Sequence, residues 1–303
     1  ENTILNIVTC SQIFTINDTT DPTITTQASN LEVQCDGNGN TAQLNAWLAS
    51  NGGAVASDVC SNVTWTNNFA SVSDTCGATG SATVTFTATD NCGNASTTSA
   101  TFTIIDDTDP TITTQASNLE VQCDGNGNTA QLNAWLASNG GAVASDVCSN
   151  VTWTNNFASV SDTCGATGSA TVTFTATDNC GNASTTSATF TIIDDTDPTI
   201  TTQASNLEVQ CDGAGNTAQL NAWLASNGGA VASDVCSNVT WTNNFASVSD
   251  TCGATGSATV TFTATDNCGN SSSTTATFTI IDNTNPTITT QASNLEVQCD
   301  GNG

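Results

Sequence analysis

Apolar and polar residues alternate along several short stretches of the chain. Val84, Phe86 and Ala88 occupy every second position of the segment TVTFTAT at residues 83–89. A period of two predicts a half-buried strand, with these side chains in a core and the threonines facing outward. The same pattern predicts further strands at residues 62–66 and 101–105, and shorter ones at residues 23–25 and 31–34.

One segment, residues 40–50, departs from this alternation. Leu44, Trp47 and Leu48 are spaced at i, i+3 and i+4, which indicates one apolar face of a helix. The asparagine that opens the segment and the glutamine three residues later have the spacing of an N-terminal capping pair, and the glycines at 52–53 predict the end of the helix. We therefore expect one short helix, packed over an edge or an open end of a β-sandwich.

The whole pattern returns every 88 residues, which identifies a tandem array. The first two complete copies are identical, and the third differs from them at six positions. Each copy is long enough to bury a modest core of its own. The sequence thus predicts an all-β chain of immunoglobulin-like sandwich domains. The expected domains are the end of a divergent domain at 1–21, repeats at 22–109, 110–197 and 198–285, and the start of a fourth at 286–303.

The charge of the chain is entirely acidic. There are 27 acidic residues and no lysine, arginine or histidine, giving a formal charge of −27. Nucleic acid is excluded as a partner, because neutralising its phosphates requires lysine or arginine. No apolar run approaches the ~20 residues that a membrane span needs. Any counter-ion for these carboxylates has to come from outside the chain.

Cysteine usage indicates the compartment. Each complete repeat contains four cysteines at fixed positions, which in the first repeat are Cys35, Cys60, Cys76 and Cys92. An even number at fixed spacing predicts disulfides, whereas a zinc site would need closely spaced pairs or histidine. Disulfides in turn predict an oxidising, extracellular location.

Several segments resemble a known family. The run TVTFTATDNCGN at residues 83–94, the run FTIID at 102–106 and the Asp-Pro opening of the next unit are similar to hyalin repeats. They look most like the four-cysteine version found in long surface proteins of the Bacteroidetes. The resemblance implies an immunoglobulin-like sandwich used as a spacer or adhesive module at the cell surface, without enzyme activity. The helical segment departs from the plain hyalin pattern and leaves the strand order near it open.

The resemblance also implies a disulfide pattern. It places Cys60 and Cys92 in loops at one end of a sandwich, and Cys35 and Cys76 at the other end. Of the three pairings possible for four cysteines, it therefore favours bonds within each repeat. The pairs expected are Cys35–Cys76, Cys60–Cys92, Cys123–Cys164, Cys148–Cys180, Cys211–Cys252 and Cys236–Cys268.

The acidic residues concentrate where one repeat passes into the next. The segment DDTDP at residues 106–110 resembles the acidic interdomain linkers of cadherins. Oxygen ligands converging from linker and loops suit calcium, although aspartate is also an ordinary turn residue and these side chains are alternatively solvated loop acids. The loss of two charges at 282–285 predicts a weaker third site. The candidate ligands are Asp18, Asp21, Asp36, Asp58, Asp74, Asp90, Asp106, Asp107, Asp109, Asp146, Asp178, Asp194, Asp195, Asp197, Asp234 and Asp266.

Catalysis and glycan binding have little support in the sequence. Without histidine, lysine, arginine or tyrosine, only a pair of carboxylates remains for acid–base chemistry, and we expect no enzyme activity. Trp47 and Trp65 are either core residues or a sugar-stacking platform. Sequons for N-glycosylation, which also arise by chance in a chain this rich in Asn, Ser and Thr, occur at Asn62, Asn94, Asn150, Asn182, Asn238 and Asn270.

Two functions follow from these observations. The first is a structural array at the cell surface, a rigid stalk or filament whose junctions calcium stiffens and whose partners are copies of the same chain. The second is an adhesin that binds glycans or a partner surface, through its repeats or through a tip domain. Exposed tryptophans in every repeat would favour the adhesin.

Overall fold

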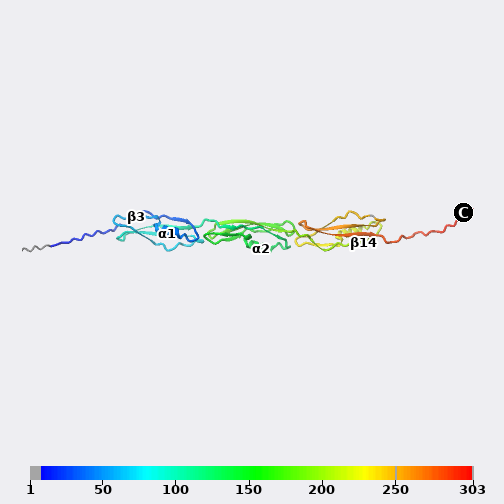
Figure 1. The fold of residues 1–303 in the computed structure, drawn as a ribbon, viewed down its shortest axis with the longest axis horizontal. Coiled ribbons are helices and arrows are strands. Elements are labelled where there is room, and N and C mark those ends of the chain that lie inside the picture. The colour runs from blue at the N-terminus through cyan, green and yellow to red at the C-terminus, as the bar shows by residue number, and fades with distance from the viewer. Residues whose placement is uncertain (1–7, 250, 302–303) are drawn as a thin grey trace, which may run out of the picture. The chain divides into compact units, whose positions relative to one another are not determined.

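A computed structural model describes residues 8–249 and 251–301 of the chain. These residues form three β-sandwich units, each with one short helix, which confirms the predicted fold class (Figure 1). Contacts divide the chain into two compact units. One comprises residues up to 118 together with 134–158 and 171–189, and the other comprises 119–133, 159–170 and residues from 190 onward. The division therefore passes through the middle repeat, because the ends of that repeat pack with different neighbours.

The first repeat contains a four-stranded and a two-stranded sheet. The larger sheet has the order β2-β6-β5-β4, in which β2 and β6 are parallel and the other pairs antiparallel, and the smaller sheet pairs β1 with β3. The elements are β1 (Thr23–Thr26), β2 (Leu31–Gln34), α1 (Thr41–Ala49), η1 (Asn51–Gly53), β3 (Val55–Ser57), β4 (Thr64–Asn67), β5 (Gly80–Thr89) and β6 (Ala95–Ile105).

The other two repeats contain the same elements in the same order. In the middle repeat these are β7 (Thr111–Thr114), β8 (Leu119–Gln122), α2 (Thr129–Ala137), η2 (Asn139–Gly141), β9 (Val143–Ser145), β10 (Thr152–Asn155), β11 (Gly168–Thr177) and β12 (Ala183–Ile193). In the third they are β13 (Thr199–Thr202), β14 (Leu207–Gln210), α3 (Thr217–Ala225), η3 (Asn227–Gly229), β15 (Val231–Ser233), β16 (Thr240–Asn243), β17 (Gly256–Thr265) and β18 (Ser271–Ile281).

The core of each repeat lies on the inner face of its two long strands. In β5 the side chains of Val84, Phe86 and Ala88 are fully buried, as the alternation predicts. Trp47 from α1 packs edge-on against Phe86, with 5.3 Å between the ring centroids, and is only 6 % exposed. Its indole Nε1 donates to the Ser29 carbonyl at 3.0 Å, so the one polar atom of the ring is satisfied. The helix therefore completes the core.

The start of α1 differs from the predicted capping pair. Asn40 precedes the helix in a left-handed conformation, with φ of 49°, and its side chain makes no capping hydrogen bond. Instead its Nδ2 donates to the Gln34 carbonyl at 2.8 Å, and its Oδ1 accepts from the Asp36 N–H at 3.2 Å. Asn40 is completely buried, and the expected cap formed with Gln43 is wrong. The left-handed backbone directs this amide to the end of β2, where it fixes the loop that carries Cys35.

Candidate functional site at the repeat junctions

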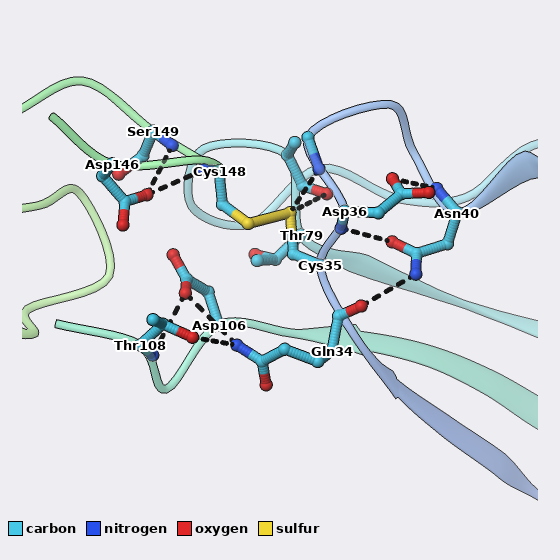
Figure 2. Close-up of a disulfide and its surroundings, with 12 residues drawn as sticks. Gln34, Cys35, Asp36, Asn40, Thr79, Asp106, Thr108, Asp146, Cys148 and Ser149 are labelled. Atoms are coloured by element: carbon cyan, nitrogen blue, oxygen red, sulfur yellow. Dashed lines mark hydrogen bonds between the residues drawn. A yellow bond between two sulfur atoms is a disulfide. The ribbon is translucent and has the colours of Figure 1, made fainter. Parts of the chain in front are cut away.

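Disulfides join each repeat to the next. Cys35 bonds to Cys148 and Cys76 bonds to Cys180, with Cα atoms 6.0 and 5.2 Å apart (Figure 2). The same pattern recurs one repeat later, with Cα separations of 6.0 Å for Cys123–Cys236 and 5.3 Å for Cys164–Cys268. Each complete junction is therefore cross-linked twice.

The expected pairing within repeats is wrong. None of the six predicted bonds forms: Cys35–Cys76, Cys60–Cys92, Cys123–Cys164, Cys148–Cys180, Cys211–Cys252 and Cys236–Cys268 are all replaced by bonds between repeats or by free thiols. Because the repeats are nearly identical, every cysteine has an equivalent one repeat away, and sequence spacing cannot distinguish a partner in the same repeat from one in its neighbour. Among the described residues, the free cysteines of the complete repeats are Cys60, Cys92, Cys211 and Cys252.

The surface of repeat 1 that receives repeat 2 is here called its C-terminal face, and it comprises Cys35, Gly37 and residues 76–78. Two segments of repeat 2, the docking loops at 146–149 and 178–182, lie against it. The Ala78 N–H donates to the Cys148 carbonyl at 2.8 Å. A Cβ atom added at Gly37 would lie 2.6 Å from the Val147 carbonyl oxygen, so this approach requires glycine.

An aspartate shapes the first docking loop. The Asp146 Oδ1 accepts hydrogen bonds from the N–H groups of Cys148 at 2.7 Å and Ser149 at 2.9 Å (Figure 2). This turn carries Cys148 toward Cys35 and directs the Asp146 carboxylate toward the linker that leaves β6.

Asp106 in that linker is the least satisfied carboxylate of the junction. Its Oδ1 accepts from Gln34 Nε2 at 3.5 Å and from the Thr108 N–H at 3.3 Å, whereas its Oδ2 is buried and has no hydrogen-bond partner among the described residues. Burial raises the pKa of Asp106, and the nearby carboxylates of Asp146 and Asp178 raise it further. The equivalent Asp194 has a buried, unpartnered Oδ2 and a raised pKa for the same reasons. A buried anionic oxygen without a donor favours a cation.

Asp178, in the second docking loop, differs from Asp106 because hydrogen-bond donors surround its carboxylate. Burial opposes its ionisation, but the Asn182 side chain and the N–H groups of residues 180–182 outweigh this and hold the pKa of Asp178 below its ordinary value. Asn182 Nδ2 donates to Asp178 Oδ2 at 2.8 Å and also to the Asp106 carbonyl at 3.1 Å. Asn182 therefore ties the loop to the linker, and the oxygens of Asp178 are already occupied by donors.

The two carboxylates left for a cation are those of Asp106 and Asp146. Ligand atoms of Asp106, Asp146 and Cys148 lie within 4.8 Å of one another, but the Cys148 sulfur is in a disulfide and offers no thiolate. The remaining donors are oxygens, which suit a hard cation such as calcium, with water in the other coordination positions. Equivalent groups occur at Asp18 with Asp58 and at Asp194 with Asp234.

The remaining predicted ligands do not join these groups within the described residues. The pKa of Asp36 is lowered by the N–H groups of Asn40 and Asn38, because this carboxylate belongs to its own loop. Gln34 and Asn182 were not predicted to contribute at the junction, and no sequence signal distinguishes them from other amides. The predicted ligands outside the groups are Asp21, Asp36, Asp74, Asp90, Asp107, Asp109, Asp178, Asp195, Asp197 and Asp266.

The sequons fall into two structural sets. Asn62 and its equivalents Asn150 and Asn238 are exposed before β4, β10 and β16. Asn94 and its equivalents Asn182 and Asn270 use their Nδ2 atoms to hold a linker carbonyl and an aspartate. Glycosylation of the exposed set is compatible with the junction, whereas a sugar on the second set would displace its hydrogen bonds.

Comparison with known proteins gives a limited result. No family model matches the chain, and no curated protein matches it. Among solved structures, mouse cadherin-23 EC22-24 is 12% identical, with 86% of this chain and 99% of that chain covered and a TM-score of 0.28. Protocadherin gamma B2 extracellular cadherin domains 1–5 are 12% identical, with 88% and 61% covered and a TM-score of 0.28. Similarity this low does not transfer a function, and the hyalin-repeat assignment remains a resemblance.

Across the part of the chain that the structure describes, no helix combines the length and the apolar character needed to cross a bilayer.

Proposed function

We propose that this chain is part of a structural extracellular array, a stalk or filament in which successive repeats are locked together covalently. The observation that carries the proposal is the pair of disulfides at each complete junction. Disulfides persist in oxidising compartments outside the cytosol, which supports a location at the cell surface. Bonds placed between repeats, rather than within them, stabilise the array as a whole.

The adhesin alternative receives less support from the tryptophans. A repeated sugar platform would need an exposed aromatic ring in each repeat. Trp47 is 6 % exposed and its Nε1 is hydrogen-bonded, while Trp65 is partly buried against the same core. Both residues therefore act in packing, and we favour the structural function.

Surface labelling tests the proposed location. Antibody raised against one repeat should bind intact producing cells as strongly as permeabilised ones, and the cysteines that pair here should resist alkylation unless a reductant is added. Labelling that requires permeabilisation, together with freely alkylated cysteines, would contradict an extracellular array.

We further propose that calcium occupies the junctions and acts on the array through Asp106 and Asp146. Their carboxylates would bind the ion, and the ion would supply the positive charge that a chain without lysine, arginine or histidine lacks. The buried Oδ2 of Asp106 supports this proposal. Binding would hold the linker of one repeat against the docking loop of the next.

Calorimetry in calcium tests this part of the proposal. Calcium should raise the Tm of the wild-type chain, since an ion at 100 times its Kd stabilises a folded state by about 2.7 kcal/mol. The double variant Asp106→Asn with Asp194→Asn should lose most of this increase and should be more stable than wild type in chelator, because it removes charge repulsion. Asp282→Asn is the matched control, since Asp282 is the equivalent linker residue but is exposed. An unchanged calcium effect in the double variant would exclude these carboxylates as ligands.

A further inference from the structure

The disulfides create a short covalent route through the chain. Along the sequence, Cys35 and Cys268 lie more than two repeats apart. The disulfides Cys35–Cys148 and Cys164–Cys268 shorten this path. Through them, the same two cysteines are separated only by the segment from Cys148 to Cys164. Most of the middle repeat, including β11 and β12, lies outside this route.

We propose that the disulfides form a load-bearing ladder that sets the maximum length of the array, an inference that rests on its proposed structural function. Tension applied to the two ends passes along the shortest covalent route. At up to ~3.6 Å per residue, the roughly 16 residues of this route extend to about 60 Å, whereas the roughly 230 residues between Cys35 and Cys268 would extend to about 800 Å. The two bridges add only their Cα separations, 6.0 and 5.3 Å.

Unfolding therefore cannot lengthen the array in the usual way. In an array without cross-links, each repeat that unfolds under force releases its whole length, or about 300 Å of chain. Here a repeat can lose its sheets and its core while the segment from Cys148 to Cys164 still holds its neighbours. While the disulfides are intact, the unfolding of one repeat therefore stays local and does not lengthen the array.

The two bonds of one junction have unequal roles in this route. Without Cys35–Cys148, tension must follow the chain from Cys35 to Cys76, cross to Cys180 and return along the chain to Cys164. This detour adds the segment between Cys35 and Cys76, which is about 140 Å long when extended. Without Cys76–Cys180, the shortest route is unchanged. The connectivity thus assigns the limiting role to Cys35–Cys148 when the chain is pulled from its ends.

Single-molecule force spectroscopy tests the ladder on the whole chain, held at both ends without reductant. Wild type should show no extension step near ~300 Å, the length of one released repeat. The variant Cys35→Ser with Cys148→Ser should gain about 140 Å, the length of the added detour. The variant Cys76→Ser with Cys180→Ser should gain nothing, although it also lacks one disulfide.

The second junction provides an independent pair of variants in case one fails to fold. Cys164→Ser with Cys268→Ser should also release about 140 Å, because the detour through Cys123–Cys236 lengthens the route by the same amount. Cys123→Ser with Cys236→Ser should release nothing. Steps as long as a whole repeat in oxidised wild type, or equal gains in all four variants, would overturn the ladder. These outcomes are independent of surface labelling, which tests the location of the array.

Discussion

The C-terminal face of the first repeat is covered by the second repeat, whereas none of the described residues covers the same face of the third repeat, here called the open face. In the first, Cys35 is 8% exposed and a Cβ atom at Gly37 would collide with Val147. In the third, Cys211 is a partly exposed free thiol, and no atom of the described residues lies within 4 Å of a Cβ atom at Gly213. The cysteines and glycines of the two faces are the same, so the difference isolates what docking adds.

The open face keeps the conformation of the covered one. Asp212 Oδ1 accepts from the Asn216 N–H at 3.0 Å, the same distance as between Asp36 and Asn40. Gly77 and Gly253 have φ angles of 59° and 60°. Each repeat therefore builds its own docking surface, and the following repeat fills a surface that already exists. Such preorganisation lowers the entropy lost when the two repeats associate.

The largest difference between the faces should come from the disulfides. Cys35→Ser with Cys148→Ser should lower the free energy of unfolding by up to about 4–5 kcal/mol, the chain-entropy value for a loop of roughly 100 residues. Denaturant unfolding without reductant measures the change. The control is Cys211→Ser with Cys252→Ser on the open face, which should alter stability by less than about 0.5 kcal/mol. Equal losses in the two variants would show that the junction disulfide contributes no stability.

A smaller difference in stability should distinguish substitutions of Gly77 on the covered face from those of Gly253 on the open face. A Cβ atom at Gly77 would lie 2.5 Å from the Cys148 carbonyl oxygen, whereas no part of the chain that the structure describes lies within 4 Å of a Cβ atom at Gly253. Both Gly→Ala substitutions share the cost of positive φ, so their difference reports crowding by the next repeat. We expect Gly77→Ala to be more destabilising than Gly253→Ala by about 1–3 kcal/mol in thermal unfolding. Identical Tm values would mean that the docking loop does not approach this glycine in solution.

The smallest effect should appear in the pH dependence without calcium. The folded-state pKa of Asp106 and of Asp194 is raised above the ordinary value of 3.8. Protonation of these two carboxylates therefore stabilises the junction at low pH, and this stability is lost as pH rises through the raised pKa. The lowered pKa of Asp178 acts oppositely, and its contribution is lost only as pH falls below 3.8.

Chelated wild type should therefore become more stable as pH decreases from neutral toward 4, and less stable at still lower pH. Thermal unfolding across this range measures both changes. Asp106→Asn with Asp194→Asn should remove the first change and retain the second. If the gain in stability between neutral pH and pH 4 survives in this variant, it comes from other groups.

Much of the fold could be predicted, because its long strands follow a simple period. Residues 83–89 alternate strictly and form most of β5, and Leu44 and Trp47 lie on the buried side of α1. β3 was not predicted, because its three residues are too few to establish a period. The predicted cap at Asn40 was wrong for another reason. The spacing of Asn40 and Gln43 carries no information about the left-handed backbone of Asn40.

The junction was less predictable than the fold. The crowding of aspartates into the linker is visible in the sequence, and the structure brings Asp106 close to Asp146. The cysteine pairing could not be predicted from the sequence, since in an exact repeat the spacing does not distinguish bonds within a repeat from bonds between repeats. The role of Asn182 depends on contacts with a linker 76 residues earlier, which local patterns do not encode.

The cysteine pairing also constrains how the chain is made. Cys35 is synthesised 113 residues before its partner Cys148, while Cys60 and Cys76 emerge much sooner. Closing a short loop costs less entropy than closing a long one, so oxidation of the nascent chain favours incorrect bonds. Each sandwich must therefore fold with reduced thiols before its bonds form, or a thiol exchange catalyst must correct them. Correct pairing in this chain thus depends on delaying oxidation until the next repeat has been synthesised, or on later exchange of the incorrect bonds.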